Sequence, residues 1–260
     1  MRRIGTALTL ILSAGAAAAA VKSEPVEYEY QGTKLKGVIY YDDAVTEKRP
    51  GVMVVHEFWG LDDYAKMRAE MLAKLGYVAL ACDMYGDGKH AEHATDAAKF
   101  AGEVRANKDV WLGRANAGLN VLKDHKAVDP KKLGVMGYCF GGSTALLVAL
   151  SGRDDVGAAV SFHGALPALT ADEAKKVKAK VAVCHGADDK LIPAETVAKF
   201  KKAFEDAGVK IVFEAYPGAV HSFTVKGAEK KGLDGIAYNK EADEKSWETM
   251  KATFKDAFGK

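Results

Sequence analysis

A cysteine lies at the centre of a short glycine-rich motif that could carry out nucleophilic chemistry. An apolar run at 133–136 leads directly into Gly-Tyr-Cys-Phe-Gly-Gly at 137–142, and helical periodicity follows. This is the Gly-x-nucleophile-x-Gly pattern of a strand-to-helix turn, with cysteine where serine is more usual. Residues two before and two after such a nucleophile approach neighbouring backbone too closely for a β-carbon. The positive end of the helix favours a thiolate, so we predict that Cys139 is a nucleophile.

A base and an orienting acid should follow the nucleophile in the order acid, then histidine. Of the seven histidines, only His221 falls in a loop just after the last expected strand, although it could also be an ordinary exposed loop residue. The acid should end the preceding strand, where Asp188 and Asp189 are adjacent. We choose Asp189, three residues after Gly186 and four before Pro193, and assign Asp188 to the turn.

Two backbone amides are candidates for an oxyanion hole. One donor should be the N–H of the residue after the nucleophile, Phe140, and the other should come from the loop after the strand at 51–55. That loop reads His-Glu-Phe-Trp-Gly at 56–60, and we choose Phe58 as its donor.

Taken together, these motifs resemble the dienelactone hydrolase family of α/β hydrolases, over essentially the whole chain beyond residue 20. The matching landmarks are Glu57-Phe58-Trp59-Gly60, the motif at 137–142, Asp189 with Pro193, and His221-Ser222-Phe223. The resemblance implies a Cys-Asp-His triad with Glu57 as a fourth member, which lies against the resting thiol until substrate displaces it. From the residues alone, Glu57 could equally be a solvated loop residue.

The arginines that hold a substrate carboxylate in this family have no counterpart here. One should stand four residues after the catalytic histidine, where this chain has Val225. The other should lie near the start of a helix after Asp96, but Arg105 comes later, and the nearby cations are Lys99 and Lys226. The candidate catalytic residues match the family, whereas the arginines that would bind the substrate carboxylate are missing. We therefore expect a substrate other than dienelactone.

The elements that must position these residues alternate along the chain. An antiparallel hairpin is expected around Gly32, over residues 28–40. Continuous apolar runs predict strands at 51–55, 78–82, 133–136, 158–161, 181–184 and 211–216. Helical periodicity predicts helices from Tyr64 to just before Gly76, capped by Asp62 or Asp63, and at 110–122, 143–150, 194–207 and 241–258. Buried strands alternating with helices predict an α/β fold with a mostly parallel sheet covered on both faces, as in α/β hydrolases.

Further residues could shape the pocket, because functional groups gather at the carboxyl ends of parallel strands. Tyr85 and His163 follow two of the expected strands, and Trp59 and Ser222 are the other candidates for substrate binding.

A metal site is not expected. His90 and His93 share a polar loop with no evident strand or helix to fix ligand geometry. Cys82 and Cys184 end strands that should not be adjacent, so we expect two buried free thiols rather than a disulfide.

The beginning of the chain predicts export. Arg2 and Arg3 precede an apolar stretch at 4–12 and a small-residue run that ends in Ala-Ala-Ala at 18–20. This pattern is typical of a cleaved signal peptide, too short and too rich in alanine to span a membrane. We therefore expect a signal peptide at 1–20, one domain at 21–260, and a periplasmic or secreted protein without a membrane anchor.

Charge and composition limit the partners. The chain has 260 residues, of which 48% are hydrophobic and 28% charged. Without residues 1–20 its 35 basic and 35 acidic residues balance, so nothing steers it to nucleic acid. We expect a monomer or small homo-oligomer without a cofactor.

The predicted function is hydrolysis of small esters or lactones by a carboxymethylenebutenolidase-like enzyme through an acyl-thioester. The alternatives are a ligand-binding pseudo-hydrolase of the same fold, disfavoured by the intact Cys, Asp and His, and a thiol redox protein. The hypothesis of a thiol redox protein is disfavoured because the chain offers no plausible resolving cysteine for Cys139.

Overall fold

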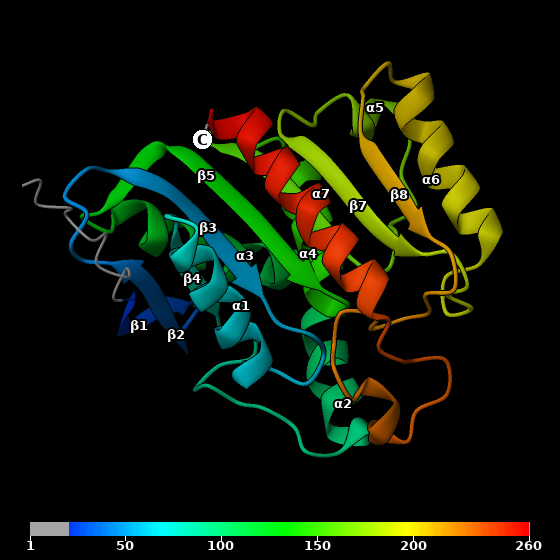
Figure 1. Ribbon diagram of the computed structural model, residues 1–260, viewed down its shortest axis with the longest axis horizontal. Helices are drawn as coiled ribbons and strands as arrows, with labels where there is room; N and C mark the ends of the chain where they lie inside the picture. Colours follow the sequence, from blue (N-terminus) through cyan, green and yellow to red (C-terminus); the bar gives the residue numbers. More distant parts are fainter. Residues whose placement is uncertain (1–20, 260) are drawn as a thin grey trace, which may run out of the picture.

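One eight-stranded sheet organises the chain, in the order β1-β2-β4-β3-β5-β6-β7-β8 (Figure 1). The computed structural model describes residues 21–259. The strands are β1 (Val21–Tyr30), β2 (Thr33–Asp42), β3 (Arg49–Val55), β4 (Val78–Cys82), β5 (Val128–Tyr138), β6 (Val156–Phe162), β7 (Lys180–Gly186) and β8 (Val212–Tyr216). The β1–β2 hairpin and the β2–β4 pair are antiparallel, and every other neighbouring pair is parallel. This confirms the predicted α/β fold.

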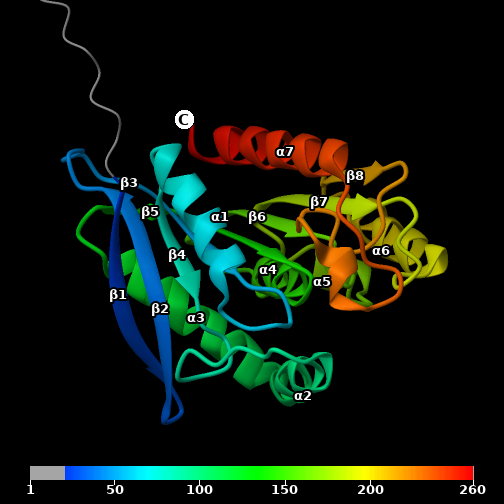
Figure 2. The same ribbon diagram turned by 60° about the horizontal axis from the view of Figure 1, so that its bottom comes forward.

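Helices cover both faces of this sheet. They are α1 (Asp63–Lys74), α2 (Ala94–Arg105), α3 (Lys108–Asp124), α4 (Phe140–Leu150), α5 (Ala171–Ala174), α6 (Ala194–Asp206) and α7 (Lys240–Phe258). Helices α1 and α7 lie on one face, and α3 and α4 lie on the other (Figure 2). Each face therefore has its own hydrophobic core.

Strand β3 shows why the central strands appear in the sequence as uninterrupted runs of apolar residues. Successive side chains of a strand point to opposite faces. Val52 and Val54 pack into the core under α1 and α7, whereas Met53 and Val55 pack into the core under α3 and α4. Because both faces are covered, neither set can be polar.

Some elements differ from the sequence-based expectation. Helix α2 begins directly after His93, so the segment that carries this histidine is not the featureless loop we expected. Its buried residues are only Ala97, Ala101 and Val104, and small side chains give weak hydrophobic contrast. Strand β5 begins earlier than expected, at Val128, which pairs with Arg49 of β3, and its polar residues 129–132 fall in the register shift before the Gly51–Leu133 pair. The one-turn helix α5 was also missed.

Other local predictions are confirmed. Asp62 caps α1, its Oδ1 accepting the Ala65 amide at 3.1 Å. Cys82 and Cys184 are buried free thiols, because β3, β5 and β6 lie between the strands that end in them. Within the described range, no helix is long and apolar enough to cross a membrane. The predicted signal peptide at 1–20 lies outside the described residues.

Candidate active site

The turn between β5 and α4 holds Cys139 in a strained backbone conformation, with φ 51° and ψ −108°. Only a tight turn makes a non-glycine residue adopt such a positive φ. A β-carbon on Gly137 would collide with the backbone of Gly141, and one on Gly141 would collide with the carbonyl oxygen of Val55. The steric reason predicted for this glycine spacing is therefore visible in the structure.

His221 and Asp189 meet at the carboxyl edge of the sheet, after β8 and β7. The Nδ1 atom of His221 lies 2.8 Å from Oδ2 of Asp189. The other oxygen, Oδ1, accepts the Leu191 amide at 2.9 Å, so both carboxylate oxygens have partners. Asp189 is buried, whereas the neighbouring Asp188 is exposed. The geometry thus brings the preferred aspartate, and not its neighbour, to the histidine.

The His221 imidazole is poised to hold a proton between Asp189 and Cys139. Burial lowers the pKa of His221, but the negative charge available on the Cys139 sulfur and the hydrogen bonds to Asp189 and Cys139 raise it more strongly. The net result is a pKa above the ordinary value for histidine. An imidazolium beside a thiolate is the arrangement that activates a cysteine.

Glu57 is a buried carboxyl group whose hydrogen-bond partner is a serine. Its Oε1 accepts the Ser222 hydroxyl at 2.8 Å and lies 3.9 Å from Nδ1 of His163. Burial raises its pKa to about 7, against the opposing effects of the Ser222 hydrogen bond and the nearby charge of His221. In the structure this carboxylate accepts the Ser222 hydroxyl, and the position against the thiol that the family resemblance implies stays a prediction.

The two candidate oxyanion donors are the backbone amides of Phe58 and Phe140. Phe140 is the first residue of α4, so its amide has no partner within the helix. The carbonyl of Phe58 accepts the hydroxyl of Tyr85 at 3.0 Å, which orients the loop after β3. The Phe140 ring stacks between His56 and Trp111, at centroid distances of 5.7 and 5.5 Å.

His163 is an internal residue, which differs from the expected place on a pocket wall. It is 1% exposed, and both ring nitrogens have partners inside the protein. Its Nδ1 accepts the backbone N–H of Cys139 at 3.1 Å, and its Nε2 lies 2.8 Å from Oγ1 of Thr224. Burial, then the charges of His221 and Arg68, holds the pKa of His163 well below its ordinary value. The neutral ring therefore supports the backbone of the nucleophile.

Thr224 connects His163 to helix α1 and, through Arg68, to helix α7. Its Oγ1 accepts the Tyr64 hydroxyl at 2.7 Å, and its carbonyl accepts Nη2 of Arg68 at 3.0 Å. Arg68 is buried and also pairs with Asp243 at 2.5 Å. Loops that carry the nucleophile and the histidine are thereby tied to α1 and α7. Sequence analysis missed Thr224, Tyr64 and Arg68, and the only sequence signal was the helical spacing of Tyr64 and Arg68.

The other predicted substrate-binding residues surround the site but are largely covered. Tyr85 and Trp59 are 5% and 6% exposed, and Ser222 is occupied by Glu57. The Nζ atom of Lys231 lies 4.7 Å above the Trp59 ring. Across residues 21–259, no group of three or more His, Cys, Asp or Glu residues comes together as a metal site.

Comparison with known proteins places this geometry in a family. The dienelactone hydrolase family model matches residues 35–258. The chain belongs to the dienelactone hydrolase family. All the candidate site residues described above lie within the matched range.

Two relatives and one solved structure illustrate the similarity. Protein usf of Aquifex pyrophilus is 32% identical over 204 residues, covering 76% of this chain and 85% of that protein. A putative carboxymethylenebutenolidase of Aquifex aeolicus is 31% identical with the same coverage. A dienelactone hydrolase-like promiscuous phosphotriesterase from metagenomic libraries superposes with a TM-score of 0.88 at 36% identity, covering 92% of this chain and 99% of that one.

Proposed function

We propose that this dienelactone hydrolase family member is an exported enzyme that cleaves small esters or lactones with Cys139 as its nucleophile. The observation that carries the proposal is the set of Cys139 on a strained turn, His221 hydrogen-bonded to it, and Asp189 at 2.8 Å from His221. Export rests on the residues at 1–20, which have the pattern of a signal peptide.

In the first half of the reaction, the Cys139 thiolate attacks the carbonyl carbon, and a carbon–sulfur bond forms as the carbonyl π pair moves to oxygen. The amides of Phe58 and Phe140 stabilise that oxyanion. When the π bond re-forms, the carbon–oxygen bond of the leaving alcohol breaks, and the His221 imidazolium gives its proton to the alkoxide. An acyl-thioester on Cys139 remains.

In the second half, His221 takes a proton from water as the water oxygen attacks the thioester carbonyl. The tetrahedral species collapses, the carbon–sulfur bond breaks, and the acid leaves with Cys139 as thiolate beside imidazolium. Asp189 keeps Nε2 of His221 directed at the reacting atoms and stabilises the positive ring. Glu57 adds a carboxyl group 3.9 Å from the His163 ring that can release a proton near neutral pH, since its pKa is about 7.

The proposed substrate class is small uncharged or weakly charged esters and lactones. The position four residues after His221 is Val225, which cannot bind a carboxylate. This supports a substrate other than dienelactone itself.

The test is an assay of wild type and Cys139→Ala on activated esters and lactones. Wild type should turn over, and intact mass spectrometry with a slow ester should detect the acyl adduct on wild type only. Cys139→Ala should lose at least about a thousandfold in kcat/KM. Cys184→Ala is the matched control, because it removes a buried sulfur elsewhere and should retain activity.

Unchanged turnover by Cys139→Ala would refute the nucleophile assignment. Tight carbonyl-ligand binding without turnover in wild type would instead establish the pseudo-hydrolase.

A further inference from the structure

A second concave surface lies along α3 and α4, outside the set of residues proposed for catalysis. It is a groove of about 530 Å³, within the size range of small-molecule sites. Its apolar walls consist of partly exposed side chains, which are Trp111, Leu112, Leu147, Leu150, Pro167 and Leu169. We call this surface the α3–α4 groove.

The rim of the α3–α4 groove carries three exposed cations. Arg105 ends α2, Lys108 begins α3, and Lys176 follows α5. Across the described range 21–259, none of the three forms an ion pair with a carboxylate. The three cations therefore have no direct ion-pair partner among the described residues, although Glu173 in the lining interacts with Lys108 and Lys176 at longer range.

The acid in the lining, Glu173, does not neutralise these cations by contact. Its carboxylate accepts the Thr170 amide at 2.9 Å and the Thr170 hydroxyl at 3.1 Å, as the cap of α5. The three cations and this one carboxylate leave the groove with a net positive charge.

Arg105 is held in place by aromatic rings. Its guanidinium carbon lies 5.2 Å from the centroid of the Phe140 ring and 5.9 Å from that of Trp111. The indole N–H of Trp111 donates to Thr144 at 2.8 Å, so the polar atom of this lining side chain already has a partner inside the protein. A cation fixed beside an apolar wall can bind an anionic head group while a hydrocarbon tail covers the wall.

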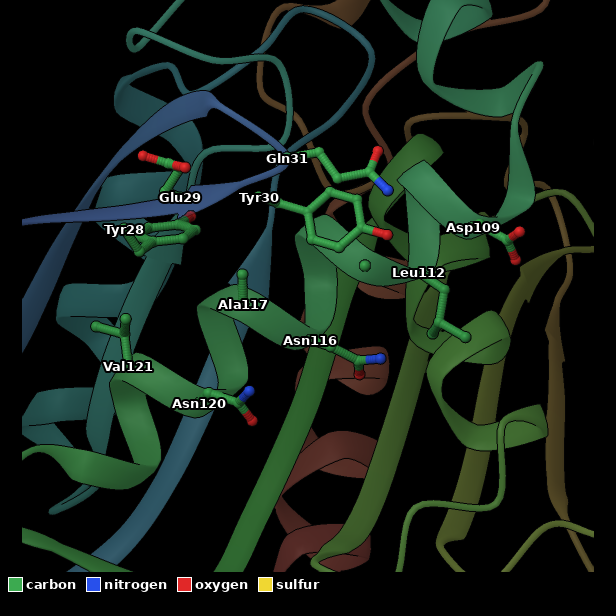
Figure 3. A pocket seen from close by; sticks show the side chains of 11 residues that line it. Tyr28, Glu29, Tyr30, Gln31, Asp109, Leu112, Asn116, Ala117, Asn120 and Val121 are labelled. Atoms are coloured by element: carbon green, nitrogen blue, oxygen red, sulfur yellow. The ribbon is translucent and has the colours of Figure 1, made fainter.

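The neighbouring groove shows that this charge is not a general property of the surface. A groove of about 840 Å³ between the β1–β2 hairpin and α3 has Glu29 and Asp109 as its charged lining residues (Figure 3). Two grooves that share Leu112 thus carry opposite charge, and only the α3–α4 groove is complementary to an anion.

We propose that the α3–α4 groove binds a linear alkyl carboxylate, with the carboxylate against Arg105 and Lys108 and the alkyl chain along Trp111, Leu147 and Leu150. Neither Cys139, His221 nor Asp189 lines this groove, although Arg105 at its rim lies over the ring of Phe140, the residue next to the nucleophile. The inference does not depend on the proposed function.

Titration of wild type with hexanoate, octanoate and decanoate by calorimetry and Trp fluorescence tests the proposal. Affinity should rise about threefold to fourfold for each added methylene that the groove buries. It should fall with added salt, because the head-group contact is electrostatic. The fluorescence response should disappear in Trp111→Phe, and decanol should bind more weakly than decanoate.

Charge variants separate the groove from other sites. Arg105→Gln should weaken decanoate binding about fivefold, and Arg105→Gln/Lys108→Gln by more than about tenfold. Lys201→Gln is the matched control, because Lys201 also lies over an aromatic ring, at 5.3 Å from Phe213, but outside the groove. Alkylation of Cys139 should leave decanoate binding unchanged.

Three results would overturn the proposal. The first is equal binding of decanol and decanoate. The second is that alkylation of Cys139 abolishes decanoate binding while Arg105→Gln binds decanoate as tightly as wild type. This result would place the ligand in the reaction centre. The third is a change of oligomeric state in the charge variants without any decanoate binding, which would assign the groove to a second copy of the chain.

Discussion

Burial of Glu57 should make the stability of the folded protein depend on pH in a direction unusual for a carboxyl group. The pKa of Glu57 is about 7 in the folded protein, against an ordinary value of 4.5. Between these two pH values the folded state binds more protons than the unfolded state, so stability falls as pH rises through this window. One pKa unit corresponds to about 1.4 kcal/mol, so the full loss above neutral pH is about 3 kcal/mol.

Glu57→Gln removes this ionisation and keeps an oxygen that can accept the Ser222 hydroxyl. We expect the variant to be more stable than wild type by up to about 3 kcal/mol at pH 8, and nearly equal to it at pH 4.5. Urea unfolding of both proteins at the two pH values, analysed by linear extrapolation, measures the difference. Glu205→Gln, which changes an exposed glutamate, should show no such pH-dependent gain. A difference that is the same at both pH values, or a variant destabilised at pH 8, would show that Glu57 is not held against ionisation.

Two further predictions concern the support of the site and the start of the chain. Thr224→Val leaves the Nε2 proton of His163 buried without an acceptor. It should lose about 2 kcal/mol of stability and at least about tenfold in kcat with a smaller change in KM, whereas Thr224→Ser should restore both. Equal damage from the serine variant would assign Thr224 a packing role only. Expressed in a bacterium with its full sequence, the protein should be recovered from the periplasm or medium with Val21 as its first residue by intact mass. Recovery from the cytoplasm with residues 1–20 attached would contradict the export prediction.

The parts of the fold that sequence predicted best are those with strong local patterns. Buried parallel strands such as Val78–Cys82 have to be apolar on both faces, so each appears as a continuous run. Helix α2 lacked such a pattern, because its buried face is made of alanines and one valine. Helix α5 is a single turn whose capping box at Thr170 and Glu173 is its main local feature. Weak contrast and short length explain these omissions.

The candidate site also contains residues that local sequence patterns predict and residues that they do not. The turn around Cys139 could be predicted because its glycines are required by contacts made within a few residues and by one neighbouring strand. Asp189 and His221 could be predicted because parallel strands bring their carboxyl ends to one edge.

The supporting network could not be predicted, because it is made by contacts between residues distant in sequence. Thr224 meets Tyr64 across 160 positions and His163 across 61 positions. No local pattern requires a hydroxyl at residue 224.

The same hydrogen-bond network couples the position of the loop that carries His221 to the position of the turn that carries Cys139. His163 supports the backbone N–H of Cys139, and Thr224, three residues after His221, supports His163. A displacement of the loop that carries the histidine therefore also removes a hydrogen bond from the residue that supports the nucleophile. Arg68 anchors that loop from α1 and is itself paired with Asp243 of α7. The relative position of Cys139 and His221 thus depends on helix contacts far from the reacting atoms, which is why Thr224 is the sharper place to test positioning than either catalytic candidate.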